Sequence, residues 1–208
     1  RLLTQERFST DPVDRQLTAA CHAASNGVAR AHLLDAREDG ALISELFTRD
    51  GCGTMVTRET YETLRGARID DVGGILELLA PLEDDGTLVR RSRELLENEI
   101  HRFAIIERDG MVIGCAALYP FPEERIGELA CVAVHSHYRN SERGVQLLRY
   151  LERRAREQSL QKLFVLTTRT AHWFREQGFE AAGVDALPTQ RQALYNWQRS
   201  SKVFVKSL

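Results

Sequence analysis

The chain has 208 residues, of which 43% are hydrophobic and 28% are charged, and its formal net charge is -2 at pH 7. This length holds one full domain and part of another, since domains usually run to roughly 100–200 residues. The balanced charge gives no reason to expect nucleic acid or an anionic membrane as a partner. The longest apolar runs fall far short of the roughly 20 residues of a membrane-spanning helix, and the first residues resemble no secretory signal. We therefore expect a globular, cytoplasmic protein.

The first 65 residues have a pattern of their own. An apolar-periodic helix around residues 17–24 stops at Gly27, and a strand "AHLLD", a helix "ALISELF" and a strand "RDGCGTMVT" follow. This order is typical of the edge of an α/β sheet. So short a region buries little surface alone, and the chain begins at Arg1, so we expect a piece of a longer protein. We place the break between domains near Arg65 and Gly66.

The next region begins with two helices and a hairpin. Apolar residues at helical spacing predict a helix from residue 68 to the acidic turn "EDDG", and "RRSRELLENEIHRF" predicts a second helix. In "FAIIERDGMVIGCAALYPF" the pair Asp109-Gly110 suits a tight turn whose residues need positive φ, with apolar residues on both sides. We therefore expect two antiparallel strands here.

The last part alternates strands and helices. "ELACVAV" predicts a buried strand, followed by an amphipathic helix with Leu148, Leu151 and Ala155 on one face. "KLFVLTT" predicts another strand, "TAHWFREQGF" a short helix ended by Gly178, and "SKVFVKSL" a closing strand. The fold class is therefore α/β, with a hairpin and a strand–turn–helix unit in one domain.

The turn "RNSERG" before the amphipathic helix is a candidate anion site. Backbone N–H groups at a helix start and the helix dipole both favour a phosphate. Asn140 and Ser141 are good N-cap residues, and Gly144 lets a ligand or a neighbouring strand approach closely. Arg139 and Arg143 add positive charge. By itself, the same turn also fits an ordinary helix cap with solvated arginines.

The stretch "ELACVAVHSHYRNSERG" and the helix after it resemble the GNAT acetyltransferases, whose motif Arg/Gln-x-x-Gly-x-Gly/Ala binds the pyrophosphate of acetyl-CoA. Arg139 and Gly144 match its first and last positions, whereas Glu142 stands where the family usually has glycine. "TTRTAHWFREQGF" resembles the family's later strand–helix segment. The resemblance implies a mixed, mostly antiparallel sheet flanked by helices, acetyl-CoA as cosubstrate, and the following contact residues: Cys131, Val132, Val134, Arg139, Asn140, Ser141, Glu142, Arg143, Gly144 and Val145.

Longer segments resemble one GNAT subfamily, the bacterial N-acetylglutamate synthases. These segments are "LVRRSRELLENEIHRFAIIERDG", "ALYPFPEERIGELACVAVH", "KLFVLTTRTAHWFREQGF" and "LYNWQRSSKVFV". "AHLLDAREDGALISELFTRDGCGTMVTRE" resembles the end of that subfamily's amino-acid-kinase-like domain. The resemblance implies a kinase-like remnant over 1–65, a GNAT domain over 66–208, and acetyl transfer to the α-amine of L-glutamate, the first step of arginine biosynthesis. We also expect a homo-oligomer.

Three chemical roles follow for this reaction. A substrate ammonium must lose a proton before it attacks, and the resemblance places the base at Glu128. Cys131 could form an acetyl-enzyme, but nothing cationic flanks it in sequence and cysteines are commonly buried, so direct attack is expected. The proton for the CoA thiolate could come from Thr167, with Thr168, His172 and water as alternatives.

Two substrate carboxylates call for two cations or well-aimed donors, and arginine suits them best. The resemblance points to "VRRSRE" and "WQRSSK", so the candidates are Arg90 or Arg91, together with Arg199 and Ser201, and with Arg191 in addition. An arbitrary arginine in such a segment is more often simply solvated.

An effector site is implied in the first third, where Glu45 would hold the guanidinium of L-arginine beside Gly51 and Gly53. No metal is expected, because the four cysteines lie far apart and no histidine stands at metal-ligand spacing; we expect reduced thiols. Two alternatives stay open. The chain could acetylate a different amine, or it could be a non-catalytic module that responds to arginine or CoA, which Glu142 in the phosphate turn would favour.

Overall fold

The computed structural model describes residues 11–48, 51–58, 62–139, 142–195 and 201–208. The chain divides into two compact units, Arg1–Tyr61 and Glu62–Leu208. Over the described ranges, none of the helices combines the length and the apolar character that crossing a bilayer demands. The same ranges hold no group of three or more His, Cys, Asp or Glu side chains placed to bind a metal ion.

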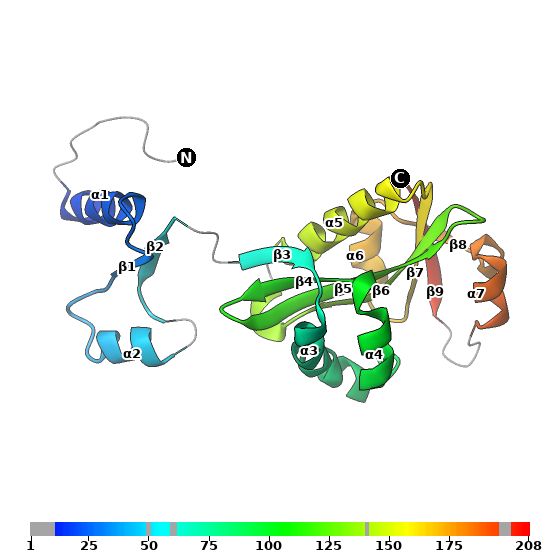
Figure 1. Ribbon diagram of the computed structural model, residues 1–208, viewed down its shortest axis with the longest axis horizontal. Coiled ribbons are helices and arrows are strands. Elements are labelled where there is room, and N and C mark those ends of the chain that lie inside the picture. Colours follow the sequence, from blue (N-terminus) through cyan, green and yellow to red (C-terminus); the bar gives the residue numbers. More distant parts are fainter. Residues whose placement is uncertain (1–10, 49–50, 59–61, 140–141, 196–200) are drawn as a thin grey trace. The chain divides into compact units, whose positions relative to one another are not determined.

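The first unit contains two helices and a two-stranded antiparallel sheet (Figure 1). Its elements are α1 (Pro12–Ser25), β1 (Arg30–Leu33), α2 (Ala41–Phe47) and β2 (Thr54–Thr57). Helix α1 begins as its sequence predicts, because the Asp11 side chain accepts the Val13 N–H at 2.9 Å and Pro12 stands in the first turn. The order of elements is the one that the sequence pattern predicts.

The second unit is built on a seven-stranded sheet in the order β3-β4-β5-β6-β7-β9-β8. Only the β6–β7 pair is parallel. The strands are β3 (Glu62–Gly66), β4 (Phe103–Arg108), β5 (Met111–Phe121), β6 (Ile126–Val134), β7 (Lys162–Thr167), β8 (Glu180–Ala182) and β9 (Lys202–Ser207). The helices are α3 (Val72–Asp84), α4 (Arg93–Glu99), α5 (Arg143–Glu157), α6 (Ala171–Glu176) and α7 (Thr189–Ala193). The predicted mixed, mostly antiparallel sheet with flanking helices is confirmed.

Helices cover both faces of this sheet (Figure 1). Helices α3 and α4 pack Ile75, Leu79 and Leu96 on one face, and α5 packs Leu147 and Leu151 on the other. Each such buried side chain contributes about 1.5–3 kcal/mol relative to an exposed one, so the two layers hold the sheet firmly. The predicted hairpin is confirmed as well, since Asp109 and Gly110 join β4 to β5 with φ of 47° and 75°.

Strand β3 starts before the break predicted near Arg65 and Gly66. Residues Glu62–Gly66 pair antiparallel with β4, so the sheet of the second unit begins at Glu62. Apolar periodicity could not reveal this strand, because "ETLRG" is an edge strand rich in charge. Its Arg65 forms ion pairs of 2.7 Å with both Asp71 and Glu107.

Strand β6 carries an irregularity that positions the candidate site. Cys115 pairs with Ala133 and Ala117 with Ala130, so β6 holds one residue more than β5 across this step. Cys131, in the bulge, has a φ of 53°. On the other side, the parallel ladder to β7 ends at Leu129 and Val165, although β6 runs on to Val134. The last five residues of β6 therefore diverge from β7, as bulged strands often do beside binding sites.

Candidate active site

The first cavity lies where β6 leaves β7, next to the starts of α5 and α6. We call it the α5 cavity; its volume is about 770 Å³. Val132 and Val134 of β6 form one wall, and Gly144 and Val145 of α5 form another. Arg139, Glu142, Arg169 and Trp173 also line it. Six of the ten residues predicted to contact the cosubstrate thus surround one space.

The start of α5 supplies the anion-binding groups of this cavity. Glu142 is the N-cap residue, is exposed, and makes no side-chain cap hydrogen bond, so the donors of the first turn are left for another acceptor. Arg139 lies beside them and donates from Nε to the Val134 carbonyl at 3.3 Å. Asn140 and Ser141, also predicted as contacts, lie outside the described residues. A backbone anion site therefore fits here, although the Glu142 carboxylate at the start of the helix is an unfavourable charge.

Two residues of the predicted phosphate turn have other partners. The Arg143 guanidinium forms an ion pair with Glu62 of β3, and its Nη1 donates to the Tyr138 carbonyl at 3.2 Å. This ion pair therefore links β3 to α5, and Arg143 is not among the residues that line the cavity. Gly144 makes room for Trp173 of α6, not for a neighbouring strand, because a Cβ there would lie 3.1 Å from the Trp173 ring.

A second cavity, the β6 pocket, gathers most of the residues predicted to handle the substrate. It measures about 300 Å³, and Arg91, Glu128, Cys131, Arg191 and Ser201 are among its lining residues. The β6 pocket and the α5 cavity share Thr87. Residues 128–131 of β6 line the β6 pocket, and the next residues, 132–134, line the α5 cavity. The two spaces thus adjoin across the bulged strand. Arg199, which was predicted with them, lies outside the described residues.

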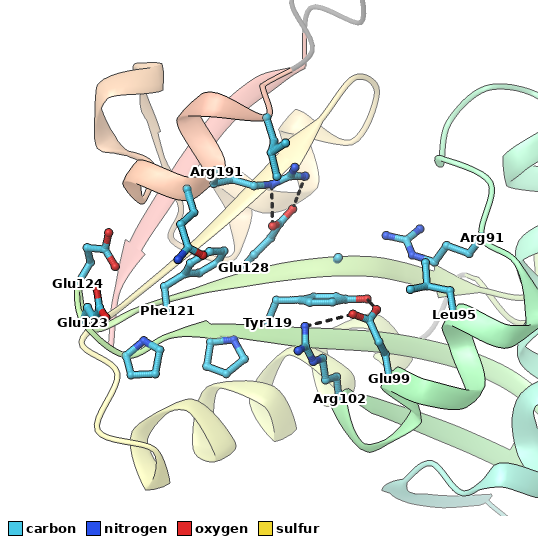
Figure 2. A pocket seen from close by; sticks show the side chains of 15 residues that line it. Arg91, Leu95, Glu99, Arg102, Tyr119, Phe121, Glu123, Glu124, Glu128 and Arg191 are labelled. Atoms are coloured by element: carbon cyan, nitrogen blue, oxygen red, sulfur yellow. Dashed lines mark hydrogen bonds and ion pairs between the residues drawn. The ribbon is translucent and has the colours of Figure 1, made fainter.

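Glu128 is the most buried carboxylate of this region, with an exposure of 8%. Arg191 of α7 forms an ion pair with it: Nη2 donates a hydrogen bond to Oε1 at 2.9 Å, and Nε lies 2.8 Å from Oε2 without the geometry of a hydrogen bond (Figure 2). The predicted base and one predicted substrate arginine therefore bind each other.

Arg90 and Arg91 differ in their contacts. The Arg90 side chain is exposed and pairs with Asp84 at 2.7 Å, whereas Arg91 is half-buried. The Arg91 guanidinium donates to the Val89 carbonyl at 3.1 Å, and the described residues place no carboxylate in an ion pair with it. Helix α4 starts only at Arg93, with Ser92 as its cap, so both arginines precede the helix that was predicted to contain them. Of these two neighbouring arginines, Arg91 is the one that lines the β6 pocket.

A third cavity, the outer pocket, shares Arg91, Glu128 and Arg191 with the β6 pocket and measures about 610 Å³. Figure 2 shows Tyr119 at its centre, between Glu128 and Glu99. The Tyr119 hydroxyl donates to Glu99 at 2.8 Å, and burial together with this bond raises the pKa of Tyr119. Tyr119 of β5 stands opposite Glu128 of β6. The sequence could have pointed to Tyr119 only if the register between these two strands had been predicted.

Cys131 is buried, and Thr167 caps a turn. Burial raises the pKa of the Cys131 thiol to about 12, an effect that nearby Arg91 only partly offsets. The Thr167 hydroxyl accepts the Thr170 N–H at 3.0 Å and so caps the turn before α6. It is not among the residues lining the three cavities, which disfavours it as the acid predicted there. His172, an alternative, is exposed and lies 3.3 Å from Glu176.

In the first unit, the predicted effector residues surround Glu45. Its Oε2 accepts the N–H groups of Cys52 and Gly53, both at 2.8 Å, and its Oε1 lies 2.5 Å from His32 Nδ1. The bond with His32, followed by those from the two amides, lowers the pKa of Glu45. Gly51 lies so close that a Cβ there would be 2.3 Å from Glu45 Oε2. Both oxygens are therefore engaged, and a guanidinium would have to replace His32.

The second unit matches a known sequence family. Residues 74–179 match the Acetyltransferase (GNAT) family. The chain is 58% identical over 203 residues to an amino-acid acetyltransferase of Azotobacter vinelandii, which covers 98% of this chain and 47% of that protein. An amino-acid acetyltransferase of Serratia proteamaculans is 59% identical over 194 residues, covering 93% and 44% of the two chains. The chain thus spans about half the length of these relatives.

Two solved structures are similar over nearly the whole chain. Both are of N-acetylglutamate synthase from Neisseria gonorrhoeae, one with coenzyme A and L-arginine and the other with coenzyme A and N-acetyl-glutamate. The first has a TM-score of 0.83 and 39% identity, covering 97% of this chain and 46% of that one. The second has a TM-score of 0.69 and 40% identity, covering 97% and 48%. From the family match, these relatives and the fold together, the chain belongs to the GNAT acetyltransferase family.

Proposed function

We propose that the chain carries an acetyl-CoA-dependent N-acetyltransferase that acts on L-glutamate and yields N-acetyl-L-glutamate and CoA. One observation carries this proposal: Arg91, Glu128 and Arg191 meet in a pocket that adjoins the α5 cavity across the bulged strand β6. The similarity to amino-acid acetyltransferases and to a structure holding coenzyme A and N-acetyl-glutamate supports it.

Acetyl-CoA fits the α5 cavity by the chemistry of its walls. The α5 start offers backbone donors and Arg139 a positive charge, which suits a pyrophosphate. The diverging end of β6, from Ala130 to Val134, offers peptide groups to an extended amide-containing chain and to the thioester oxygen. Arg169, which no sequence motif marks, also lines the cavity, and its Nη1 donates to Asp85 Oδ2 at 3.0 Å.

The substrate's carboxylates are proposed to bind Arg91, Arg191 and Ser201, with Arg199 as a further candidate. Arg91 is half-buried and has no carboxylate partner among the described residues. A bound substrate carboxylate would therefore compensate its positive charge. Ser201 lines the same pocket, and its carbonyl accepts the Tyr195 hydroxyl. A pocket rich in arginine favours a dicarboxylic amino acid over a polyamine or a lysine side chain.

The proposed chemistry is direct attack. Glu128 accepts one proton from the substrate's α-ammonium, and the neutral nitrogen attacks the thioester carbonyl. The new C–N bond forms as the C–S bond breaks, and the thiolate leaves with the second proton of the amine, delivered through water. Glu128 returns its proton to solvent, so one proton is released in each turnover. Because the pKa of Cys131 is about 12, that thiol stays protonated near neutral pH and is a poor nucleophile.

Release of CoA from acetyl-CoA tests the proposal. Addition of L-glutamate is expected to raise the rate of thiol release far above that with L-glutamine, L-lysine or spermidine. A faster rate with one of the amines would favour acetylation of another substrate. Binding of CoA without turnover of any amino acid would favour a non-catalytic module instead.

We further propose that the first unit takes part in a response to L-arginine, with Glu45, Gly51 and Gly53 at the site. The similar structure that holds L-arginine supports this. Inhibition of glutamate-dependent CoA release by L-arginine, lost in Glu45→Gln, is the expected result. Equal inhibition of both proteins would place the effector elsewhere.

A homo-oligomer remains a prediction that light scattering would test.

A further inference from the structure

The ion pair between Glu128 and Arg191 has a consequence for substrate choice. It places the guanidinium against the carboxylate that is proposed to take the substrate's proton, with a hydrogen bond to Oε1 and an ion contact to Oε2. We propose that Arg191 is a substrate-operated switch: the second carboxylate of a dicarboxylic amino acid replaces Glu128 at the Arg191 guanidinium and so releases Glu128 to act as base. This proposal rests on the proposed function and adds a specificity-determining role for Arg191.

The positions of the groups make such an exchange possible. Arg191 and Glu128 both line the β6 pocket and the outer pocket, so a ligand in either space reaches their contact (Figure 2). The Arg191 side chain is 29% exposed and the Glu128 side chain 11%, so the arginine is the partner that an arriving anion meets more readily. Arg191 projects from the five-residue helix α7, whereas Glu128 projects from the middle of the sheet.

The energetics favour an exchange and disfavour a simple rupture. Breaking a buried ion pair leaves an uncompensated charge, and Glu128 is only 8% exposed. An arriving carboxylate gives the Arg191 guanidinium a new anionic partner, while the substrate's ammonium gives Glu128 a new cationic partner. Both charges are therefore compensated in the exchanged state. The two charge pairs become the substrate carboxylate with Arg191 and the substrate ammonium with Glu128.

An amino acid with one carboxylate cannot complete this exchange. Its α-carboxylate can pair with Arg91, which has no carboxylate partner among the described residues. A neutral side chain such as that of L-glutamine then offers Arg191 no anion, and Glu128 stays held. The switch therefore predicts discrimination against L-glutamine in kcat as well as in KM, since the bound but wrong substrate faces an occupied base.

Arg191→Leu separates this role from simple carboxylate binding. With Glu128 no longer held, kcat for L-glutamine is expected to rise by about threefold to tenfold, the range of one partly exposed charged contact. The KM for L-glutamate rises in the same variant. An arginine that only binds the substrate would change the glutamate KM and leave kcat for glutamine as it was, and that result would overturn the switch.

Arg191→Lys guards against a variant that fails to fold. Lysine keeps the charge but replaces the planar guanidinium with a compact ammonium on a flexible stem, which should hold Glu128 less firmly, so kcat for glutamine is again expected to rise. An unchanged or lower value in a variant that still binds CoA overturns the proposal. Arg153→Leu is the matched control, because Arg153 forms an exposed pair with Glu157 at 3.9 Å on α5. If the unaltered chain releases no CoA with glutamate, the proposed function itself fails, which is a separate outcome.

Discussion

At the scale of single residues, the partners of a charged side chain decide what else it can bind. Arg91, Glu128 and Arg191 line one pocket. The Arg143 guanidinium instead pairs with Glu62, which lies 81 positions away in the sequence. The difference depends on long-range partners that a local motif does not contain.

Glu128→Gln tests the proposed base. An amide cannot accept the ammonium proton, so kcat for L-glutamate is expected to fall by about 10²- to 10⁴-fold, the usual worth of a positioned base. The KM for acetyl-CoA should change little, because Glu128 is not among the lining residues of the α5 cavity. Steady-state CoA release with each substrate varied in turn would measure both. A kcat near that of the unaltered chain would remove Glu128 from the mechanism.

Cys131→Ala tests direct attack. With a pKa of about 12, the thiol is protonated throughout the range from pH 6 to pH 9, so no thiolate titrates there. The variant is expected to keep kcat within about threefold, which is the effect of a small packing change near the site. Mass spectrometry after incubation with acetyl-CoA alone should find no acetyl group on Cys131 in the unaltered chain. A stoichiometric adduct would contradict direct attack.

At the scale of elements, β6 and α5 create the site through irregularities. The strand was predictable from its apolar run, but its bulge was not, because an extra residue is visible only against the register of β5. Helix α5 was predictable from its amphipathic pattern, and its cap is where the sequence departs from the family motif. Glu142 puts a carboxylate at the helix end that attracts anions, although the charge there is exposed.

Glu142→Gly should therefore tighten CoA. Removing an exposed negative charge beside a pyrophosphate site is worth roughly 0.3–1 kcal/mol, so the Kd is expected to fall by about twofold to fivefold. Titration calorimetry at low and high salt would show the gain shrinking as salt screens the charge. Glu142→Gln controls for the flexibility of glycine and should give most of the effect. An unchanged affinity would mean that the carboxylate turns away from the ligand.

At the scale of the whole molecule, the second unit contains the complete seven-stranded sheet and all three cavities. Most of its elements were predictable because their apolar residues follow helical or strand periods. Strands β3 and β8 and helix α7 were not, since each is short or rich in polar residues and is fixed by pairing or packing with distant segments. Among these, α7 carries Arg191, so the sequence could nominate that residue but not its partner.

Two truncations test where the second unit begins. A chain of residues 62–208 keeps β3 and is expected to fold and bind CoA like the full chain. A chain of residues 67–208 loses the edge strand and the Glu62–Arg143 ion pair. Exposing β4 and leaving Arg143 without this partner should lower its melting temperature by several degrees, since about 1 kcal/mol shifts a domain of this size by roughly 2–8 °C. Equal melting temperatures would show that β3 adds no stability.

The separation of the cavities bears on the order in which two reactants can arrive. The α5 cavity and the outer pocket have no lining residue in common, and the β6 pocket borders each of them. A molecule seated in one therefore need not block the approach to the other. When initial rates are measured with both substrates varied, the double-reciprocal plots are expected to give intersecting lines. Each product, CoA or N-acetyl-L-glutamate, should inhibit the reaction when the other product is absent. The bulge in β6 would then lie where two separate substrate entry paths meet, at the bond that reacts.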